Sequence, residues 1–210
     1  MHKYVVRYTK EGDAKFISHL DFLRAVQRAM RRADLPIKYS EGFNPHPCLS
    51  FAQPLGIGVT GENEWFEAEM TEEVPDLASR LDRAMPRGVH IREAILEVKN
   101  RFAAIMRAEY LVTPAALPED VAIAAFLARE EIPIEKRTKS GTKMTDIRPM
   151  IDTISRRDKQ LFMRIAAGSA VNLKPQTVMD ALEAYIPEYH AGFCRYHRLA
   201  LLDHDNQPIY

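Results

Sequence analysis

The spacing of hydrophobic residues along the chain changes repeatedly between two periods. Runs that alternate apolar and polar residues predict strands, whereas apolar residues three and four apart predict helices. The predicted strands are residues 4–8, 65–70 and 89–98, followed by residues 106–112, 161–166 and 193–202. The predicted helices are residues 18–33, the segment after Pro75, residues 118–129 and the segment after Pro175. The sequence therefore predicts a protein that mixes strands and helices.

The order of these elements repeats once. Two of the helices carry apolar residues in the same phase and end at Pro86 and at Pro187, which is 101 positions later. Each half reads βαββαβ, the ferredoxin-like arrangement in which two helices cover one face of a four-stranded antiparallel sheet. We therefore expect an α+β protein with two tandem ferredoxin-like domains, residues 1–100 and residues 105–210, joined near residues 99–104.

Alternation in the strand at residues 65–70 separates two faces. Phe66, Ala68 and Met70 fall on the face that is expected to meet the helices. Trp65 falls on the other face, where it is either an exposed stacking surface or part of an interface between the halves. We favour the interface, because large aromatic side chains usually bury.

Composition limits the class of protein. The chain has 210 residues, of which 46% are hydrophobic, and this is enough for one large or two small globular domains. Its formal net charge is zero, so any phosphate binding must come from local clusters rather than from bulk charge. The sequence has no apolar run of membrane-spanning length and does not begin like a signal peptide. We therefore expect a cytoplasmic protein with no membrane partner.

The helix predicted at residues 18–33 separates an apolar side from a cluster of arginines. Ser18 can cap this helix, with Asp21 at the third helical position. The side chains expected to pack are Leu20, Leu23, Val26, Met30 and Ala33, and the opposite side carries Arg24, Arg28, Arg31 and Arg32. Like charges at this spacing disfavour a helix. The cluster is therefore expected to meet RNA phosphates, or carboxylates of the same chain or of a protein partner.

Residues 39–54 contain too many glycine and proline residues for a regular element, and they predict a shaped loop that leads into a strand. Gly42 permits a positive φ, while Pro45 and Pro47 stiffen the path. The residues expected to read a nucleotide or to dock a partner are Tyr39, Phe43, Asn44 and His46. For Phe43 and Phe51, packing into the core is the favoured alternative.

These segments resemble a family of bacterial radical SAM-linked proteins of uncharacterised function. The family pattern is F-x-S-H-L-D, R-A-x-R-R-A, Y-S-x-G-F-N-P-H-P and S-F-A-x-P-L. The chain carries it at residues 16–21, 28–33, 39–47 and 50–55, and Cys48 stands where the pattern suggests a basic residue. Members of this family look like companions of a radical SAM enzyme, fused to its C-terminal end or encoded beside it. The resemblance implies association with such an enzyme as a partner, and it does not imply a reaction.

Cysteine usage excludes one activity. A radical SAM enzyme ligates its iron–sulfur cluster with several closely spaced cysteines, whereas this chain has two, Cys48 and Cys194. Two cysteines fit a reducing compartment. A zinc site made from His19, His46 and Cys48, with or without Cys194, has suitable ligand types, but its spacing fits no strong zinc signature. We therefore expect no metal and no cofactor.

A second basic cluster lies in residues 135–148. Its members are Lys136, Arg137, Lys139, Lys143 and Arg148, around Gly141. Its polar composition predicts a hairpin tip or a mobile loop. The cluster is either solvated surface or a finger that engages RNA phosphates, with an affinity that falls as salt rises. Residues 195–198 add a weaker alternation of basic and aromatic side chains.

Three functions are compatible with these features, and the sequence favours a chain that is not itself an enzyme. The favoured function is a non-catalytic companion that binds RNA, with no preference for DNA, and presents it to a radical SAM partner for modification. The second is a protein adaptor without RNA affinity. The third, suggested by an architectural resemblance to CRISPR repeat-processing endonucleases, is metal-independent RNA cleavage with His19, His46 and Tyr39 as candidate catalytic residues. The RNA, the modification, the oligomeric state and the role of Cys48 stay open.

Overall fold

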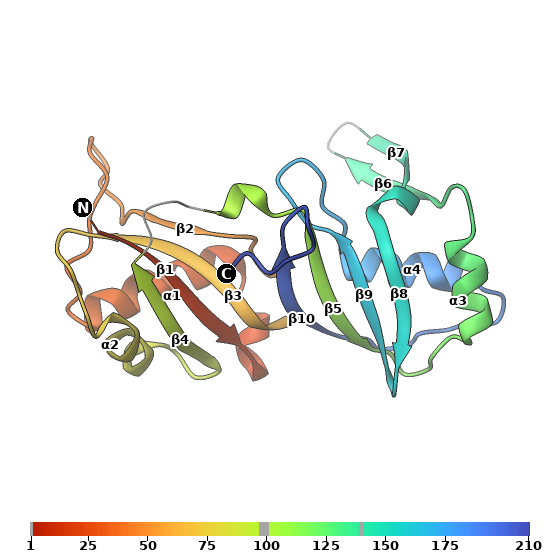
Figure 1. Cartoon of the computed structure of the whole chain (residues 1–210), viewed down its shortest axis with the longest axis horizontal. Helices are drawn as coiled ribbons and strands as arrows, with labels where there is room; N and C mark the ends of the chain where they lie inside the picture. The colour runs from red at the N-terminus through yellow and green to blue at the C-terminus, as the bar shows by residue number, and fades with distance from the viewer. Residues whose placement is uncertain (1, 97–100, 139–140) are drawn as a thin grey trace. The chain divides into compact units, whose positions relative to one another are not determined.

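The computed structural model describes residues 2–96, 101–138 and 141–210. The chain divides into two compact units, residues 1–103 with Ile209 (unit 1) and residues 104–208 with Tyr210 (unit 2). Both units contain strands and helices, which confirms the α+β class (Figure 1). No helix in the described part of the chain is long and apolar enough to cross a membrane.

In the described part of unit 1, two α-helices accompany an antiparallel sheet. In chain order the elements are β1 (His2–Lys10), η1 (Gly12–Phe16), α1 (His19–Arg32), β2 (Leu49–Phe51), β3 (Val59–Met70), α2 (Leu77–Ala84) and β4 (Val89–Leu96). The strands pair in the spatial order β4-β1-β3-β2, and each of these pairs is antiparallel. A short 3₁₀ helix, η2 (Phe102–Ala104), lies at the boundary between the units.

Unit 2 has the same order of elements with one insertion. Its elements are β5 (Arg107–Thr113), α3 (Asp120–Leu127), β6 (Pro133–Thr138), β7 (Gly141–Asp146), η3 (Arg148–Met150), β8 (Ile151–Arg157), β9 (Gln160–Ala166), α4 (Pro175–Tyr185) and β10 (Arg195–Leu202). The main strands pair in the order β10-β5-β9-β8, all antiparallel. The inserted strands β6 and β7 pair with each other in a separate hairpin.

The predicted strands and helices are present with displaced ends. The strand predicted at residues 193–202 begins at Arg195, and the helix predicted at residues 118–129 covers residues 120–127. Val98 and the start of the joint predicted near residues 99–104 lie outside the described residues. The sequence had not placed β2 and β8; β2 is three residues long, which is too short to show an alternating pattern.

The core of unit 1 lies between its helices and one face of its sheet. Phe66, Ala68 and Met70 are fully buried on the helix side, as the alternation predicted. Trp65 on the opposite face is 3% exposed, which is incompatible with an exposed stacking surface.

The apolar face of α1 matches its prediction at Val26 and Met30 and differs elsewhere; Leu23 and Ala33 are half-buried. Its buried residues are Phe22, Val26, Ala29 and Met30. Leu20, which was expected to pack, is 60% exposed. The physical reason is that Phe22 is buried and that Leu20, two residues earlier, lies about 200° away around the helix axis.

This difference can be tested by truncating the two side chains. We expect Phe22→Ala to lower the free energy of unfolding by about 3–5 kcal/mol, because it opens a cavity in the core. Leu20→Ala is the matched control, and it should change that free energy by less than about 0.5 kcal/mol. Denaturant titration measures both values. Equal losses in the two variants would mean that the described face of α1 is wrong.

Candidate functional site

The N-terminal end of α1 is fixed by the predicted cap. The Asp21 amide donates to Ser18 Oγ at 3.2 Å, and Ser18 Oγ donates to Asp21 Oδ2 at 2.7 Å. The hydrogen bond from Ser18 holds the pKa of the Asp21 carboxyl below its ordinary value, and Arg24 adds to this with a bond of 3.1 Å. Arg24 therefore has a carboxylate partner within its own helix.

His19 lies beside a buried lysine rather than beside other candidate residues. Its ring meets the edge of Phe51, with 5.4 Å between ring centroids. Lys10 is 1% exposed, and its Nζ donates to the Ile17 carbonyl at 2.8 Å and lies 5.3 Å from the centroid of the Phe22 ring. Burial lowers the pKa of His19, and the positive charge of Lys10 lowers it further. His19 is therefore a neutral packing residue at neutral pH.

The arginines of α1 are all exposed, but they differ in their contacts. Arg32 donates to the Ala84 carbonyl of α2, and Arg24 bonds to Asp21. The guanidinium groups of Arg28 and Arg31 form no hydrogen bond or ion pair with any described residue. The charge of Arg28 still acts on the Asp21 carboxyl, whose pKa it helps to lower. The Arg31 guanidinium has no carboxylate partner among the described residues.

Residues 38–48 form a narrow hairpin that extends from the sheet. The Cys48 amide donates to the Lys38 carbonyl at 2.9 Å, and the Ser40 amide donates to the His46 carbonyl at 2.8 Å. Ser40 Oγ also accepts from the His46 amide at 3.1 Å and lies 2.9 Å from His46 Nδ1. Tyr39 pairs with Pro47 across the hairpin. His46 therefore closes the hairpin.

The tip of this hairpin presents an aromatic ring. Phe43 is fully exposed, with a relative exposure of 106%, and Tyr39 is 39% exposed. Gly42 has φ +119°, a conformation that favours glycine, and this turn carries Phe43 and Asn44 outward. The expectation that Phe43 fills the core is thus wrong, because the hairpin ends beyond the sheet. Phe51, by contrast, packs against Phe66 with 5.5 Å between ring centroids.

The base of the hairpin is attached to β3 by backbone and by charge. The Lys38 amide donates to the Glu69 carbonyl at 2.9 Å, and the Glu69 amide donates to the Cys48 carbonyl at 3.0 Å. Lys38 Nζ lies 2.9 Å and Lys3 Nζ 3.2 Å from the Glu69 carboxylate. The hydrogen bond from Lys38, followed by the contacts of Lys3, lowers the pKa of Glu69. The hairpin is therefore held at a fixed angle to the sheet.

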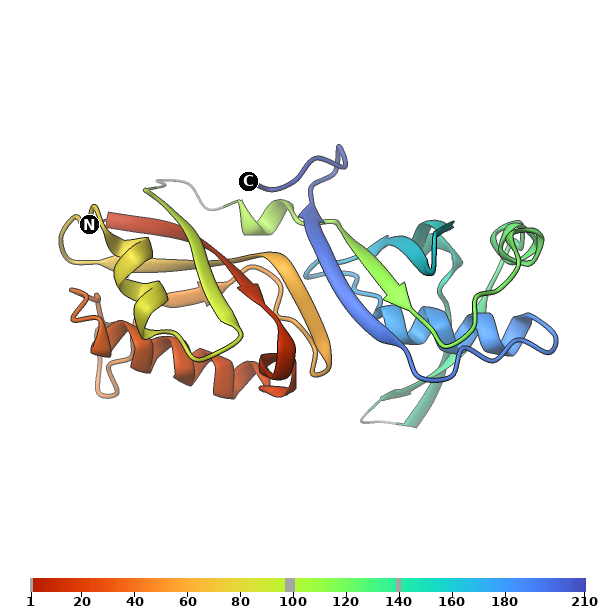
Figure 2. The same ribbon diagram turned by 90° about the horizontal axis from the view of Figure 1, so that it is seen from below.

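The C-terminal end of α1 and the hairpin share one end of unit 1 (Figure 2). Ile37, five residues after α1 ends, pairs with Met70 at the end of β3. His19 begins α1, and a helix of 14 residues is about 21 Å long. The last turn of α1 and the hairpin therefore lie at one end of unit 1, and the first turn of α1, which begins at His19, lies at the other.

The second basic cluster is a hairpin, one of its two predicted forms. Lys136 lies directly opposite Lys143 in the β6–β7 pair, and both are exposed. Arg137 pairs with Thr142 through its backbone, and Lys139 lies outside the described residues. Arg148 is not part of this surface. It is half-buried and donates to the carbonyls of Leu127 at 2.8 Å and Ile151 at 2.9 Å.

The final strand does not form a basic surface either. Arg198 is 2% exposed and Tyr196 is 9% exposed, so both belong to the interior. Burial raises the pKa of the Tyr196 hydroxyl, which donates to Gln176 Oε1. Alternation along β10 thus reflects packing.

Both cysteines are free and half-buried. Burial raises the pKa of the Cys194 thiol, so it is not an activated nucleophile. Within the described residues, the one group of side chains close enough to share a metal ion is Asp203, His204 and Asp205, in an exposed turn. Exposed acidic turns are common without a metal, and nothing else in the structure points to one here.

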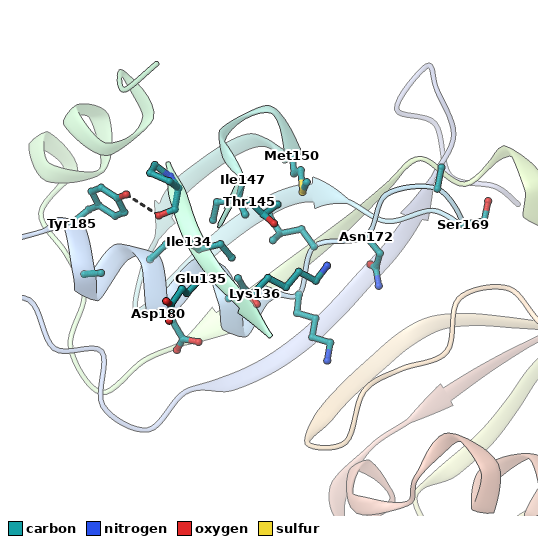
Figure 3. Close-up of a pocket in the computed structure, with 17 residues that line it drawn as sticks. Ile134, Glu135, Lys136, Thr145, Ile147, Met150, Ser169, Asn172, Asp180 and Tyr185 are labelled. Carbon is teal, nitrogen blue, oxygen red and sulfur yellow. Dashed lines mark hydrogen bonds between the residues drawn. The ribbon is translucent and has the colours of Figure 1, made fainter. Parts of the chain in front are cut away.

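The sequence analysis missed a cavity in unit 2. It has a volume of about 820 Å³ and lies between the β6–β7 hairpin and α4 (Figure 3). Apolar side chains such as Ile134, Ile147 and Leu173 form part of its wall, and Lys136 and Asp180 are among its charged residues. A cavity between segments that are about 40 residues apart gives no local sequence signal. Lys136 was the one lining residue that the sequence analysis had named, as a member of the second basic cluster.

The fold and these surfaces define an α+β protein that exposes basic and aromatic groups from one end of unit 1. The chain belongs to the family described as "Uncharacterized protein conserved in bacteria (DUF2344)", whose profile matches residues 3–175. No curated protein matches the chain.

A chain from the crystal structure of a Cbf5-Nop10-Gar1 complex is similar, with a TM-score of 0.46 and 11% sequence identity. The likeness covers 94% of this chain and 48% of that chain, so this chain spans about half the length of the similar one. A likeness at this level carries no conclusion about partners.

The lowered pKa of His19 predicts a pH dependence of stability. In the unfolded chain His19 has its ordinary pKa of 6.5, so below pH 6.5 the unfolded state binds more protons than the folded state. The free energy of unfolding should therefore lose the His19 contribution as the pH falls from 6.5 through the lowered pKa. His19→Gln should flatten this part of the profile, as measured by denaturant titration between pH 4 and 8.

Lys10→Met provides the second part of this test. Removing the lysine charge should move the pKa of His19 upward, toward its ordinary value, as followed by NMR titration of the ring protons. An unchanged pKa would show that Lys10 does not act on His19.

Proposed function

We propose that the chain is a non-catalytic companion of a radical SAM enzyme that binds RNA through one end of unit 1 and presents it for modification. The observation that carries this proposal is that Arg28, Arg31 and the Phe43 ring are exposed in one unit, and that the two guanidinium groups form no hydrogen bond or ion pair with a described residue. The resemblance of residues 16–55 to radical SAM-linked proteins supports the choice of partner. The hairpin lysines Lys136 and Lys143 are proposed as further phosphate contacts.

The two arginines are suited to phosphate. Arg28 lies four residues from both Arg24 and Arg32, a spacing at which like charges disfavour the helix by about 0.2–0.5 kcal/mol per pair. An RNA backbone would offset this repulsion, and guanidinium groups bind phosphate oxygens in bidentate geometry. Because net charge is zero, RNA would be recognised at this face and not over the whole surface.

The hairpin adds a contact of a different kind. Phe43 exposes its ring from a hairpin closed by Ser40 and His46, so little conformational entropy would be lost when a base stacks on the ring. Stacking does not depend strongly on base identity, whereas the amide of Asn44 can hydrogen-bond to a base edge. The arginines would thus set affinity and the hairpin would hold an unpaired nucleotide.

The architecture of both units fits this role. We propose that they are tandem ferredoxin-like domains, residues 1–100 and 105–210, supported by the matching strand orders β4-β1-β3-β2 and β10-β5-β9-β8. A catalytic role is not supported, since His19 is a packed residue at the far end of α1 from Tyr39 and His46. An adaptor function would use the same arginines against carboxylates of the enzyme, and the following experiments separate the two.

The arginines can be tested as a pair. We expect Arg28→Ala with Arg31→Ala to weaken binding of single-stranded RNA at least about tenfold. The slope of log affinity against log salt should fall by about 1.4, because two phosphate contacts are lost. The matched control removes two exposed arginines elsewhere in unit 1, Arg87→Ala with Arg92→Ala, and should retain the wild-type affinity and slope.

Fluorescence anisotropy at several salt concentrations measures these values. If the two double variants bind RNA equally, the assignment of α1 to RNA is wrong. If the wild type prefers RNA no more than an acidic polypeptide, and the Arg28 and Arg31 variant alone fails to co-purify with the radical SAM enzyme, the chain is an adaptor.

The Phe43 ring can be tested separately. We expect Phe43→Ala to reduce the affinity for single-stranded RNA by the equivalent of about 1–3 kcal/mol, the contribution of one stacked base. Its free energy of unfolding should stay within about 0.5 kcal/mol of the wild type, because the ring contributes nothing to the core.

Phe16→Ala is the control for this experiment. Phe16 is also exposed, at 61%, but it precedes the N-terminal end of α1. RNA affinity should survive this change. Equal losses in the Phe16 and Phe43 variants would contradict a specific role for the hairpin tip.

A further inference from the structure

We propose that the cavity between the β6–β7 hairpin and α4 binds one nucleotide, with Lys136 and Lys174 holding its phosphate and Asp180 accepting hydrogen bonds from its base. This site lies in unit 2, whereas the proposed RNA surface is centred on α1 of unit 1. The inference therefore goes beyond the proposed function and does not depend on it.

The helix α3 is shorter than its counterpart in unit 1. α3 has 8 residues and α1, its counterpart in unit 1, has 14, which correspond to about 12 Å and 21 Å of helix. α3 meets α4 at the C-terminal end of α4, where the Phe126 and Tyr185 ring centroids are 6.1 Å apart. The β6–β7 hairpin lies over α4 as far as Tyr185, and the space between them is the cavity of about 820 Å³. This volume is within the range of small-molecule sites.

The β6–β7 hairpin, which covers one side of the cavity, is attached to the rest of unit 2 where its two strands begin and end. The Tyr185 hydroxyl donates to the Pro133 carbonyl at 2.9 Å, the contact drawn in Figure 3. Asp146 Oδ1 accepts from the amides of Ile132 at 2.7 Å and Arg148 at 2.9 Å. An isolated hairpin is marginally stable, so these bonds hold β6 and β7 above α4. The cavity is therefore a feature of the folded unit.

The charged side chains that line the cavity are exposed and lack ion-pair partners of opposite sign within the described chain. Lys136, Lys174 and Glu135 line it and form no ion pair with any described residue, and Asp180 accepts one hydrogen bond, from Gln176 Nε2 at 2.7 Å. In Figure 3 the Lys136 ammonium group and the Asp180 carboxylate lie on opposite sides of the cavity. A ligand that satisfies both has an anionic end and an end that donates hydrogen bonds.

Repulsion between Lys136 and Lys143 also favours binding of an anion near Lys136. Lys143 lies directly opposite Lys136, and paired residues of neighbouring strands project from the same face. Like charges in this position destabilise a hairpin. A phosphate between Lys136 and Lys174 would relieve this repulsion.

The part of the cavity between the lysines and Asp180 has apolar surface that suits a flat ring. Ile134, Ile147 and Met150 contribute apolar surface, against which a nucleobase or a ribose ring can pack. Lys174 is the N-cap residue of α4 and Asp180 is the sixth residue of the helix, so their backbones are separated by about 9 Å along the helix axis. This length is comparable with the span from the phosphate of a nucleotide to the outer edge of its base.

The Asp180 carboxylate favours bases that donate hydrogen bonds. Guanine presents adjacent ring N–H and amino donors, which fit the acceptor oxygens of a carboxylate. Uracil offers a single N–H flanked by two carbonyl oxygens, which a carboxylate repels. A guanine nucleotide is therefore the expected ligand.

Calorimetric titration of the full chain with mononucleotides tests this site. GMP should bind at least about tenfold more tightly than IMP, which lacks only the 2-amino group, and more tightly than UMP. Asp180→Ala should weaken GMP binding and make the affinities for GMP and IMP equal, because neither base then has a carboxylate acceptor. Lys174→Ala should weaken GMP and IMP alike by about tenfold.

Lys159→Ala, an exposed lysine of the β8–β9 turn, is the matched control and should bind GMP as the wild type does. Equal affinities for GMP, IMP and UMP, or GMP binding that is insensitive to Lys174→Ala, would overturn the assignment. Because Lys174 and Asp180 belong to unit 2, the effects of their substitution are independent of the Arg28 and Arg31 test.

Competition identifies the source of the nucleotide. An oligouridine with one central guanosine that displaces GMP would show that the cavity accepts a nucleotide of RNA. If that oligomer does not displace GMP, the ligand is a free nucleotide. Both results support nucleotide recognition at the cavity.

Discussion

A cluster of four aromatic rings fixes the geometry of unit 1. Tyr8 of β1 lies 5.2 Å from Phe22 of α1 and 5.7 Å from Phe66 of β3, measured between ring centroids. Phe51 of β2 contacts all three. Each such pair contributes about 0.5–1.5 kcal/mol beyond the burial of its area, and together the pairs join four elements. The rotation of α1 about its axis, and thus the direction of its arginines, depends on this cluster.

The motif segments of residues 16–55 contain residues that pack or cap the fold and residues that are exposed. Ser18 caps α1, His19 packs on Phe51, and Lys10 satisfies the carbonyl that precedes the cap. Arg28 and Phe43 have no comparable role in the core. A motif that looks like one functional unit in the sequence therefore has a structural part and an exposed part, and the proposed RNA contacts come from the exposed part.

Periodicity predicted much of the fold, because it reports which side of an element is buried. It placed the strands around Phe66 and the helices before Pro86 and Pro187, and with them the order of elements in each half. It failed for Leu20, because Phe22 and not Leu20 faces the core at the start of α1, and the two residues lie about 200° apart around the helix axis.

Charge and aromaticity were less informative about the candidate site. Arg148 resembles its exposed neighbours in sequence, yet it bonds to two backbone carbonyls. Phe43 resembles a core residue, yet it stands at the tip of a hairpin whose base depends on Glu69, far along the chain. The cavity over α4 is lined by residues between 133 and 150 and between 169 and 185, so no single segment contains it. Long-range geometry of this kind is decided by packing and not by local pattern.

Crosslinking of bound single-stranded RNA to the wild-type protein, with the attachment sites located by mass spectrometry, tests the central claim most directly. RNA binding by the exposed end of unit 1 predicts attachment within residues 24–46, with Phe43 or its neighbours among the sites. Attachment concentrated on β4 or around Phe16, with residues 24–46 unmodified, would contradict it.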